Sequence, residues 1–338
     1  MKALVTGGLG LIGYNIVQKL AHQEIATAIV DNLSNYHGAI NMKELGYLYG
    51  ERLKTLHELP QKYVSLNYLH KDIERELDIE SCFNFVKPDI VYHMACPPRQ
   101  KIVGLNPALC ANTMTGGLLN VLMCCVKYKV KRLVFISSSM VYGDFDDNVT
   151  EDAICNPQGE YGILKLAGEG LVKDYNRKYG LNYTIIRPSA VYGPLDLSDR
   201  VISKFLLTAM GNGELTVNGE NETLDFTYVD DAATGIAQAG LSEEAENKTY
   251  NITKSHSKTL LAAAQLAVEI AGKGSITITS KDDDFPSRGA LDITAAVNDF
   301  GYNPKVDIEE GFNLYHEWLS NSVYWNQKAI SKFAKTTT

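Results

Sequence analysis

Short apolar segments alternate with longer amphipathic segments along the N-terminal half of the chain. Residues 2–6 form a short apolar run, and apolar residues at helical spacing follow at Ile12, Ile16, Val17 and Leu20. A predicted strand and a predicted helix then recur about every 25 to 30 residues. The predicted strands are 2–6, 27–30, 63–69, 90–94 and 133–136, and the predicted helices begin near Ile12 and cover 36–62, 74–86 and 106–126. This order predicts an α/β protein with a doubly wound parallel sheet.

A glycine-rich turn joins the first predicted strand to the first predicted helix. It contains Gly7, Gly10, Leu11, Ile12 and Gly13. Glycines let the backbone approach a pyrophosphate, and the helix N-terminus faces its negative charge. Asp31 ends the next predicted strand, where a carboxylate accepts hydrogen bonds from a ribose 2′-hydroxyl and repels a 2′-phosphate. The sequence therefore predicts a Rossmann-type site for NAD in preference to NADP.

The regular alternation ends near residue 188. Residues 188–225 and 257–320 lack it, whereas two segments within 225–256 are typical of a return to the sheet. We therefore expect residues 1–187 to form an NAD-binding Rossmann domain to which 225–256 return. Residues 188–338 should form mainly a smaller C-terminal substrate-binding lobe.

Tyr161 and Lys165 lie four residues apart and would share one face of a helix. A free phenol has a pKa of about 10 and is a poor base at neutral pH. The Lys165 ammonium and a positively charged nicotinamide ring both stabilise the phenolate, so we expect a lowered pKa for Tyr161. Spacing alone does not distinguish this pair from a tyrosine and a lysine that share a helix face and have no catalytic role.

Three serines, Ser137, Ser138 and Ser139, follow the predicted strand 133–136. They stand at the strand end where doubly wound sheets bind ligands, although a polar turn would look the same. No Gly-x-Ser-x-Gly motif surrounds them, which argues against a nucleophilic serine. With Tyr161 on the next helix, one serine hydroxyl is expected to hydrogen-bond the substrate oxygen that Tyr161 deprotonates.

Composition excludes several other classes of protein. The chain has 338 residues and a formal net charge of −8, which argues against nucleic-acid and anionic-membrane partners. The six cysteines show no Cys-x-x-Cys spacing and the chain has no His-Glu-x-x-His motif, so we expect reduced thiols and no metal site. No apolar run approaches about 18 residues and no signal peptide precedes the first strand. We therefore expect a cytoplasmic protein without a membrane-spanning helix.

Motifs spread over nearly the whole chain resemble those of one enzyme family. In chain order they are Thr6-Gly-Gly-Leu-Gly-Leu-Ile-Gly13, Asp31-Asn32, Asp72-Ile73, Val91-Tyr-His-Met-Ala95, Ser137-Ser-Ser-Met-Val-Tyr-Gly143, Tyr161-x-x-x-Lys165, Arg187-Pro-Ser-Ala-Val-Tyr-Gly-Pro194, Asp225-Phe-Thr-Tyr-Val-Asp-Asp231, Arg288 and Gly301-Tyr-Asn-Pro304. Together they resemble the extended short-chain dehydrogenase/reductase family, in particular its NAD-dependent nucleotide-sugar epimerases and dehydratases.

The resemblance implies roles for individual residues. Ser138 matches the catalytic Ser/Thr of the family, which acts with the tyrosine and lysine matched by Tyr161 and Lys165. The expected NAD contacts are Gly7, Gly10, Leu11, Ile12, Gly13, Asp31, Asn32, Asp72, Ile73, Ala95, Tyr161, Lys165 and Pro188. The resemblance also implies a homodimer through helices at about 106–126 and 161–179. Apolar surface in the first of them would come from Leu118, Leu119, Leu122 and Met123.

The sequence departs from the family pattern at three places. Leu224 stands where sugar epimerases usually have an arginine for the substrate pyrophosphate, and Ala190 where they often have an asparagine. The glycine pair after Asn112 comes one or two residues later than usual. Arg288 matches a family pyrophosphate ligand, and Arg200 could replace the missing arginine, although each also fits a solvated surface position. The expected substrate contacts are Ser138, Ser139, Arg200 and Arg288.

The residue beside the catalytic serine separates the reactions that the family performs. Dehydratases use an Asp-Glu pair directly after the Ser/Thr, and decarboxylases usually keep the glutamate. This chain has Ser139-Met140 instead, and a thioether cannot transfer protons. An epimerase needs no such acid, because the 4-keto sugar turns in its pocket and takes the hydride back on the other face.

We therefore expect an NAD-dependent nucleotide-sugar 4-epimerase, similar to UDP-glucose 4-epimerase. One alternative is a dehydratase, decarboxylase or reductase of the same family with an acid supplied from elsewhere. Another is a non-catalytic NAD-sensing protein on the same fold, against which the intact Ser138, Tyr161 and Lys165 argue.

Overall fold

A parallel sheet of seven strands forms the centre of the computed structural model, which describes residues 1–34, 36, 38–59, 67–282 and 285–327. The strand order is β11-β6-β5-β4-β1-β2-β3. The strands are β1 (Lys2–Thr6), β2 (Ala26–Asp31), β3 (Asn67–His70), β4 (Ile90–His93), β5 (Arg132–Ile136), β6 (Tyr183–Pro188) and β11 (Lys248–Ile252). The chain runs outward from β1 to β3 and then returns to β4 on the other side of β1. This topology confirms the predicted Rossmann-type doubly wound sheet.

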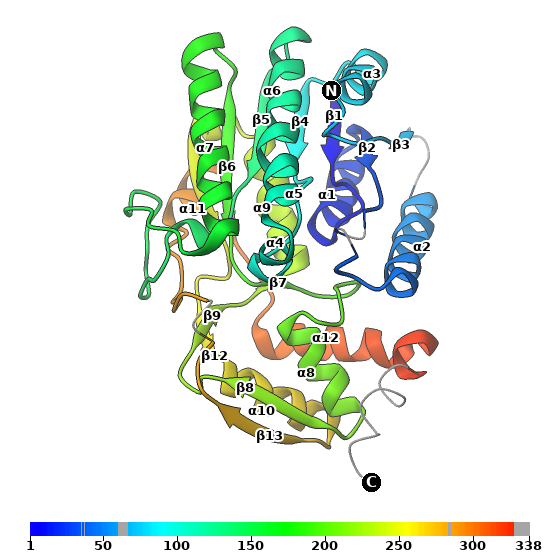
Figure 1. Cartoon of the computed structure of the whole chain (residues 1–338), viewed down its shortest axis with the longest axis vertical. Coiled ribbons are helices and arrows are strands. Elements are labelled where there is room, and N and C mark those ends of the chain that lie inside the picture. The colour runs from blue at the N-terminus through cyan, green and yellow to red at the C-terminus, as the bar shows by residue number, and fades with distance from the viewer. Residues whose placement is uncertain (35, 37, 60–66, 283–284, 328–338) are drawn as a thin grey trace.

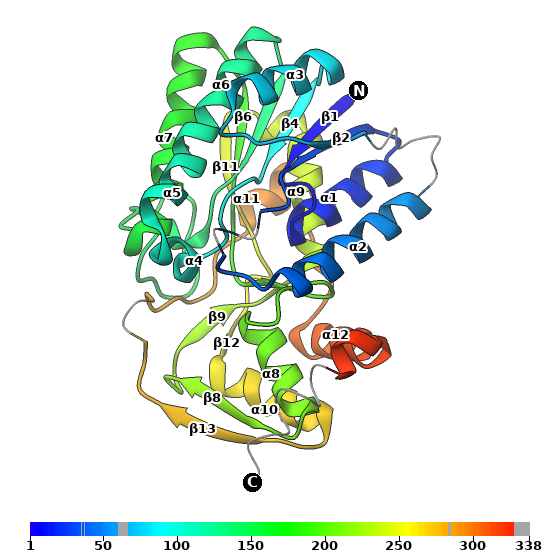
Figure 2. The same cartoon turned by 45° about the vertical axis from the view of Figure 1, so that its right-hand side comes forward.

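Helices cover both faces of the sheet because successive strand residues point to opposite sides (Figures 1 and 2). In β1, Leu4 faces one hydrophobic core while Ala3 and Val5 face the other. The Leu4 side is covered by α3 (Glu76–Val86), α6 (Leu118–Lys127) and α7 (Gly159–Tyr179), and the opposite side by α1 (Leu11–His22) and α9 (Val229–Leu241). The cavity described below lies beyond the carboxyl ends of these strands.

A π-helical turn interrupts the predicted helix 106–126. The segment consists of α5 (Pro107–Ala111), the π turn η1 (Asn112–Gly117) and α6. This turn takes up the extra spacing between Asn112 and the glycine pair, since a π turn holds more residues than an α-helical turn.

The helical stretch Pro107–Lys127 is 21 residues long with a mean hydropathy of 1.5. By length and composition it is long and apolar enough to cross a membrane, so the expectation that no apolar segment reaches this length is wrong. The stretch is apolar on average although polar residues such as Asn112 and Thr113 interrupt its apolar runs. Core helices of soluble proteins pass the same test, and 44% of the apolar window is buried inside this protein.

Two further helices lie beside the cavity. Helix α2 (Met42–Glu58) falls within the predicted helical segment 36–62, and α4 (Gln100–Leu105) follows the loop after β4. The predicted strand 63–69 corresponds to β3 at its end, while its first part, 63–66, lies outside the described residues.

A smaller group of elements lies below the sheet in Figures 1 and 2. It contains α8 (Val201–Met210), β8 (Glu214–Asn218), α10 (Leu260–Ala271), β13 (Ser275–Thr279) and α12 (Ile308–Asn321). We call this group the lower lobe. Strand β8 pairs with β13, while β9 (Thr223–Asp225) pairs with β12 (Ser257–Thr259) near the sheet. Helix α9 and strand β11 place parts of 225–256 on the large sheet, and the exact domain boundaries stay a prediction.

Candidate active site

The predicted site residues line a cavity at the carboxyl end of the sheet. Its volume is about 780 Å³, and its walls come from the ends of β1, β2, β4, β5 and β6 and from α8, β8 and α10 of the lower lobe. Ordinary ligand pockets measure about 300 to 1,000 Å³. The lining includes Gly7, Gly10, Leu11, Ile12, Gly13, Asp31, Asn32, Asp72, Ile73, Ala95, Ser138, Ser139, Tyr161, Lys165, Pro188, Arg200 and Arg288. The structure therefore brings all of them together, while their roles stay predictions.

The turn between β1 and α1 is too tight for side chains at two of its glycines. Gly7 has a φ of 68°, and a Cβ atom there would lie 2.8 Å from the Cα atom of Ala95. A Cβ atom at Gly13 would lie 2.3 Å from the carbonyl oxygen of Gly7. At Gly10 the nearest atom to a Cβ would be 3.2 Å away, so this side of the turn is more open. The arrangement fits a pyrophosphate at the N-terminus of α1.

Asp31 is fixed at the end of β2 by two backbone hydrogen bonds. Its carboxylate oxygens accept from the N–H groups of Leu9 at 3.0 Å and Leu33 at 2.9 Å. Burial raises the pKa of this carboxyl group, and the two N–H groups oppose that effect. A carboxylate held in this way beside the glycine turn fits the hydroxyls of an adenosine ribose.

The loop after β3 is held by its neighbours on two sides. The Asn32 amide donates to Asp72 at 3.0 Å, and Asn120 of α6 donates to the carbonyl oxygen of Ile73 at 2.9 Å. A Cβ atom at Gly117 would lie 2.6 Å from the Ile73 side chain, so this glycine allows α6 to approach the loop closely. The geometry fits the predicted adenine contacts of Asp72 and Ile73.

The π turn adds a third contact to this loop. Glu74 accepts hydrogen bonds from the Asn112 amide at 2.6 Å and from the Thr113 hydroxyl, both of which belong to the π turn. Such turns are often found at functional sites. In this protein the π turn faces the cavity wall, since both Glu74 and Thr113 line it.

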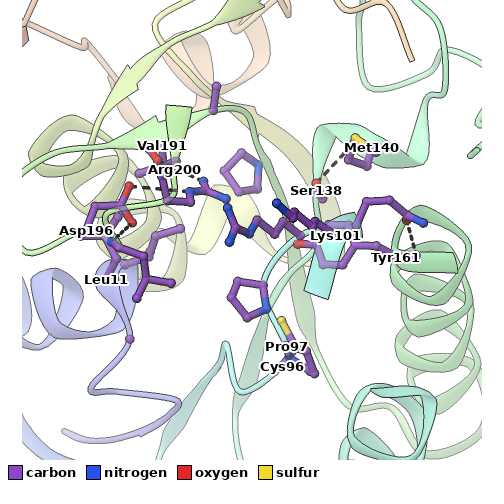
Figure 3. Close-up of a pocket in the computed structure, with 18 of the residues that line it drawn as sticks. Leu11, Cys96, Pro97, Lys101, Ser138, Met140, Tyr161, Val191, Asp196 and Arg200 are labelled. Atoms are coloured by element: carbon purple, nitrogen blue, oxygen red, sulfur yellow. Dashed lines mark hydrogen bonds and ion pairs between the residues drawn. The ribbon is translucent and has the colours of Figure 1, made fainter. Parts of the chain in front are cut away.

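Ser138, Tyr161 and Lys165 meet at the centre of the cavity. Lys165 Nζ donates to the carbonyl oxygen of Ile136 at 2.6 Å and lies 5.8 Å from the centre of the Tyr161 ring. Ser138 Oγ accepts from the Met140 N–H at 3.2 Å, and the Ser138 hydroxyl is one of the groups that lower the pKa of the Tyr161 phenol. Figure 3 shows Ser138 and Tyr161 on neighbouring walls of the cavity. The set has the geometry of a proton acceptor with a cation and a hydroxyl beside it.

The electrostatic environment of Tyr161 differs from the expectation. Burial raises the pKa of the phenol, and the Lys165 ammonium is the largest influence that lowers it. In the chain by itself, without the positively charged nicotinamide on which the expectation also depends, removal of the ring from water outweighs the charge of Lys165. Burial also lowers the pKa of Lys165, but Cys96 and Tyr161 beside it raise that pKa overall, so the amine stays protonated.

Two basic side chains gather at another part of the cavity. Arg288 is half-buried, and its buried Nε has no hydrogen-bond partner within the described ranges. Removal from water lowers the pKa of Arg288 to about 10, and the positive charge of Arg200, which lines the same cavity, adds to that effect. Arg200 lies 3.6 Å from Asp196. Two neighbouring guanidinium groups suit a ligand with two negative charges. Leu224 and Ala190 also line this cavity.

The sequence analysis missed several residues of the cavity wall. Cys96, Gln100 and Lys101 lie in or just after the loop that follows β4, and Gln100 Oε1 accepts from the Tyr161 N–H at 2.9 Å. Their position after the carboxyl end of a central strand is a signal that could have indicated them.

Arg52 of α2 was also missed. Its buried guanidinium donates to the carbonyl oxygens of Leu9, in the glycine turn, and Leu195, in the loop before Arg200. No motif accompanies Arg52, because it comes from the helical insertion.

The fold and the site define a nucleotide-dependent enzyme with a Tyr–Lys pair beside its cofactor turn. Residues 3–253 match the model of the NAD dependent epimerase/dehydratase family. The chain belongs to this family, and its cofactor is NAD.

Similar proteins include different members of the family. A putative UDP-glucose 4-epimerase from Methanocaldococcus jannaschii is 29% identical, over 94% of this chain and 98% of that protein. UDP-glucuronic acid decarboxylase 6 from Arabidopsis thaliana is 30% identical, over 94% of this chain and 88% of that protein. The crystal structure of the Thermotoga maritima UDP-glucose 4-epimerase with UDP-glucose has a TM-score of 0.83 at 29% identity, over 95% and 99% of the two chains.

Proposed function

We propose that the protein is an NAD-dependent nucleotide-sugar 4-epimerase. The observation that carries this proposal is a complete proton-transfer set without a neighbouring acid. Ser138, Tyr161 and Lys165 are together, whereas the side chain after Ser139 is the thioether of Met140. The groups with the largest influence on the Tyr161 phenol are Lys165, Cys96, Arg200 and Ser138, and none of these is a carboxylate.

The chain's own residues account for the proton chemistry at carbon 4 of the sugar. Tyr161 accepts the proton of the carbon-4 hydroxyl while Ser138 donates a hydrogen bond to the same oxygen. Lys165 stabilises the phenolate that precedes this transfer. NAD, when bound, would supply the acceptor and donor of the hydride at carbon 4. When the keto sugar has turned, Tyr161 gives the proton back.

Each part of NAD would bind a different segment of the cavity wall. The glycine turn and the N-terminus of α1 would take its pyrophosphate, Asp31 its adenosine ribose, and the Asp72–Ile73 loop its adenine. Lys165 would contact the nicotinamide ribose, and Pro188 at the end of β6 would lie beside the nicotinamide. Each of these residues lines the cavity.

The diphosphate of a nucleotide sugar would bind Arg200 and Arg288. A bidentate guanidinium contact suits phosphate oxygens. The Nε of Arg288 is buried without a hydrogen-bond partner in the described part of the chain, which is unfavourable, and an anion bound there would offset that cost. The similar proteins support this substrate class, since the Thermotoga maritima structure contains UDP-glucose and the Arabidopsis thaliana relative is named for UDP-glucuronic acid.

Product analysis tests the proposal. The purified protein is incubated with a panel of nucleotide sugars, and the products are identified by mass spectrometry and NMR. An epimerase gives a product of equal mass with inverted configuration at carbon 4. Loss of water would show a dehydratase, and loss of carbon dioxide would show a decarboxylase. The Tyr161→Phe variant, which keeps the ring but lacks the base, is the matched control.

A further inference from the structure

Lys101 is a cation of the cavity for which the structure shows no partner. It lies in the first turn of α4, is exposed and lines the cavity. Four other cations of the lining are paired with carboxylates: Lys71 with Asp78, Arg99 with Asp199, Arg200 with Asp196 and Lys281 with Glu222. The Lys101 ammonium has no hydrogen bond or ion pair with any residue in the described ranges of the chain. It is therefore available to an anion of the substrate.

The neighbours of Lys101 fix its place between the reacting centre and the phosphate-binding arginines. Gln100 Oε1 accepts from the Tyr161 N–H, and Arg99 donates to Asp199, the residue before Arg200. In Figure 3, Lys101 lies in the middle of the labelled residues, with Arg200 on one side and Tyr161 on the other. A sugar that joins a diphosphate to the catalytic tyrosine would occupy this part of the cavity.

Two hydroxyls near the catalytic serine extend the polar surface of this region. Ser139 Oγ donates to Ser189 Oγ at 3.2 Å, and both side chains are buried and line the cavity. Ser139 follows the end of β5 and Ser189 the end of β6. Hydroxyl groups and an ammonium together match the acceptor-only chemistry of a carboxylate.

The charges of a nucleotide sugar decide what Lys101 has left to bind. A diphosphate diester carries two negative charges, for which Arg288 and Arg200 supply guanidinium donors, although Arg200 also lies 3.6 Å from Asp196. The substituents closest to carbon 4 are the carbon-3 hydroxyl and the group at carbon 6, and of these only carbon 6 can carry a carboxylate. A neutral hexose therefore offers no further charge for Lys101 to bind. A hexuronic acid offers the carboxylate at carbon 6, to which the Lys101 ammonium is complementary.

We propose that Lys101 recognises a carboxylate at carbon 6, so that the preferred substrate is a nucleoside-diphosphate hexuronic acid. This inference rests on the proposed nucleotide-sugar chemistry and narrows it to one substrate class. Lys101 acts as a specificity residue that contacts the substrate and transfers no proton. Met140 is compatible with the role because it places no competing negative charge beside Ser139.

Steady-state kinetics with two UDP-sugars test the inference. For each enzyme, kcat/KM is measured with UDP-glucuronic acid and with UDP-glucose. The wild type should prefer the uronic acid. Lys101→Met should lower kcat/KM for UDP-glucuronic acid about ten- to a hundredfold, the usual effect of removing a hydrogen bond to a charged group, and leave UDP-glucose nearly unchanged.

Lys204 provides a matched control. It also lines the cavity, its ammonium has no partner in the described part of the chain, and it lies one helical turn after Arg200. Lys204→Met should leave the ratio of the two kcat/KM values unchanged. If Lys101→Met lowered kcat/KM equally for both sugars, Lys101 would bind the diphosphate and the inference would be overturned. An unchanged kcat/KM for both sugars would overturn it as well.

A binding measurement separates recognition from turnover. Calorimetric titration is carried out with proteins that also carry Tyr161→Phe, so that no turnover occurs. Lys101→Met should weaken the binding of UDP-glucuronic acid and leave the binding of UDP unchanged. If the protein epimerised UDP-glucose but not UDP-glucuronic acid, the uronic-acid preference would be refuted and the proposed function would stand. Failure to epimerise any nucleotide sugar would refute the proposed function, and this inference with it.

Discussion

Individual residues of the centre act through their neighbours. The Lys165 ammonium is anchored to the carbonyl oxygen of Ile136 and faces the Tyr161 ring, while Ser138 is anchored by the Met140 N–H. These anchors fix the positions of side chains that would otherwise sample several rotamers. The centre should therefore tolerate a change of one functional group without losing its shape.

The first prediction concerns the proposed base. Tyr161→Phe keeps the ring and its packing, so folding and NAD binding should survive. The rate of hydride transfer in a single turnover should fall about 10²- to 10⁴-fold, because general-base assistance is lost. Lys165→Met should lose as much or more, since the phenolate also loses its cation. Absorbance of the reduced cofactor follows the reaction, and a Tyr161→Phe rate above a tenth of wild type would refute the assignment.

The second prediction concerns pH. His93 Nδ1 shares a hydrogen bond of 2.8 Å with the Thr6 hydroxyl, and burial followed by the charge of Lys165 lowers the pKa of His93 to about 3. An unfolded chain protonates this histidine at about pH 6.5, so below that pH the unfolded state binds more protons. The contribution of His93 to stability is therefore complete above about pH 6.5 and declines as the pH falls toward 3.

Urea unfolding at several pH values measures this effect. His93→Asn keeps a polar atom near the Nδ1 position and does not titrate in this range. Its free energy of unfolding should fall less steeply than that of wild type between pH 6.5 and pH 4. Parallel pH profiles for the two proteins would show that His93 is not held neutral.

Motif residues of the site could be predicted from the sequence, while several of their partners could not. The glycines, Asp31, Tyr161 and Lys165 have fixed spacings because local backbone geometry requires them. Gln100 and Lys101 contact or face the same centre from a loop with no required spacing. The effect of burial, which raises the pKa of Tyr161, could not be predicted, because burial is a property of the folded protein and does not follow from the spacing of two residues.

At the scale of elements, the β1–α1 turn gives a prediction about NAD. Gly13→Ala places a Cβ atom against the carbonyl oxygen of Gly7, so the turn must open. Overpacking of this size costs about 1 to 3 kcal/mol of stability, and an opened turn should bind NAD more weakly because its N–H groups no longer face the pyrophosphate. Gly46→Ala in α2 is the control, because nothing lies within 4 Å of its added Cβ atom.

Nucleotide released from the purified proteins by denaturation measures the retained cofactor. The wild type and Gly46→Ala should release NAD or NADH, and Gly13→Ala should release much less. A predominance of NADP in the wild type would contradict the role of Asp31. Equal NAD content in all three proteins would show that the turn tolerates a side chain at Gly13.

Helix α7 and strand β6 are joined by a buried ion pair. Arg187 of β6 donates to both carboxylate oxygens of Glu169 at 2.9 and 2.7 Å, and Glu169 also accepts from the Ser137 hydroxyl at 2.6 Å. Both charged side chains are almost completely buried. The pair therefore connects the helix of Tyr161 to the strand ends that carry Ser137 and Pro188.

Removal of one partner of this pair should be costly. Glu169→Gln leaves the Arg187 guanidinium buried without its counter-charge, for which losses of about 3 to 5 kcal/mol are typical. The free energy of unfolding in urea should fall accordingly. Asp174→Asn on the same helix is the control, because the exposed Arg177 and Lys178 pairs of Asp174 should contribute less than about 1 kcal/mol. Equal losses in the two variants would contradict the prediction.

At the scale of the whole molecule, part of the expected dimer surface belongs to the core. Leu118 and Leu122 are fully buried against the sheet, which corrects their assignment to an exposed interface. Apolar side chains remain exposed on α5, α6 and α7, at Leu109 (50%), Met123 (48%) and Ile163 (52%). Their helices are neighbours in space, so the homodimer through this face stays a prediction.

Light scattering tests this assembly. Wild type should have the mass of a dimer at micromolar concentration, and Leu109→Glu combined with Met123→Glu should give a monomer, since both place a charge in an apolar contact. Val323→Glu is the control, because Val323 is exposed at the far end of α12. A monomeric wild type would refute the prediction.

The overall architecture was easier to predict than the spatial relation of its parts. Strand and helix periodicities are local, and a parallel order follows from them. The contact of Arg52 with Leu195 joins residues that are far apart in the chain, and no local pattern encodes it. The same holds for the lower lobe, whose strands β8 and β13 pair across more than fifty residues.

The π turn at Asn112–Gly117 has a consequence for how this chain is aligned with its relatives. A π turn inside an α-helix is the usual trace of a one-residue insertion, which the helix absorbs without moving its ends. Such an insertion leaves the residues on both sides in place in space while it changes their separation along the chain. An alignment forced through this helix without a gap would shift one of its halves by about 100° around the helix axis and transfer roles to the wrong side chains.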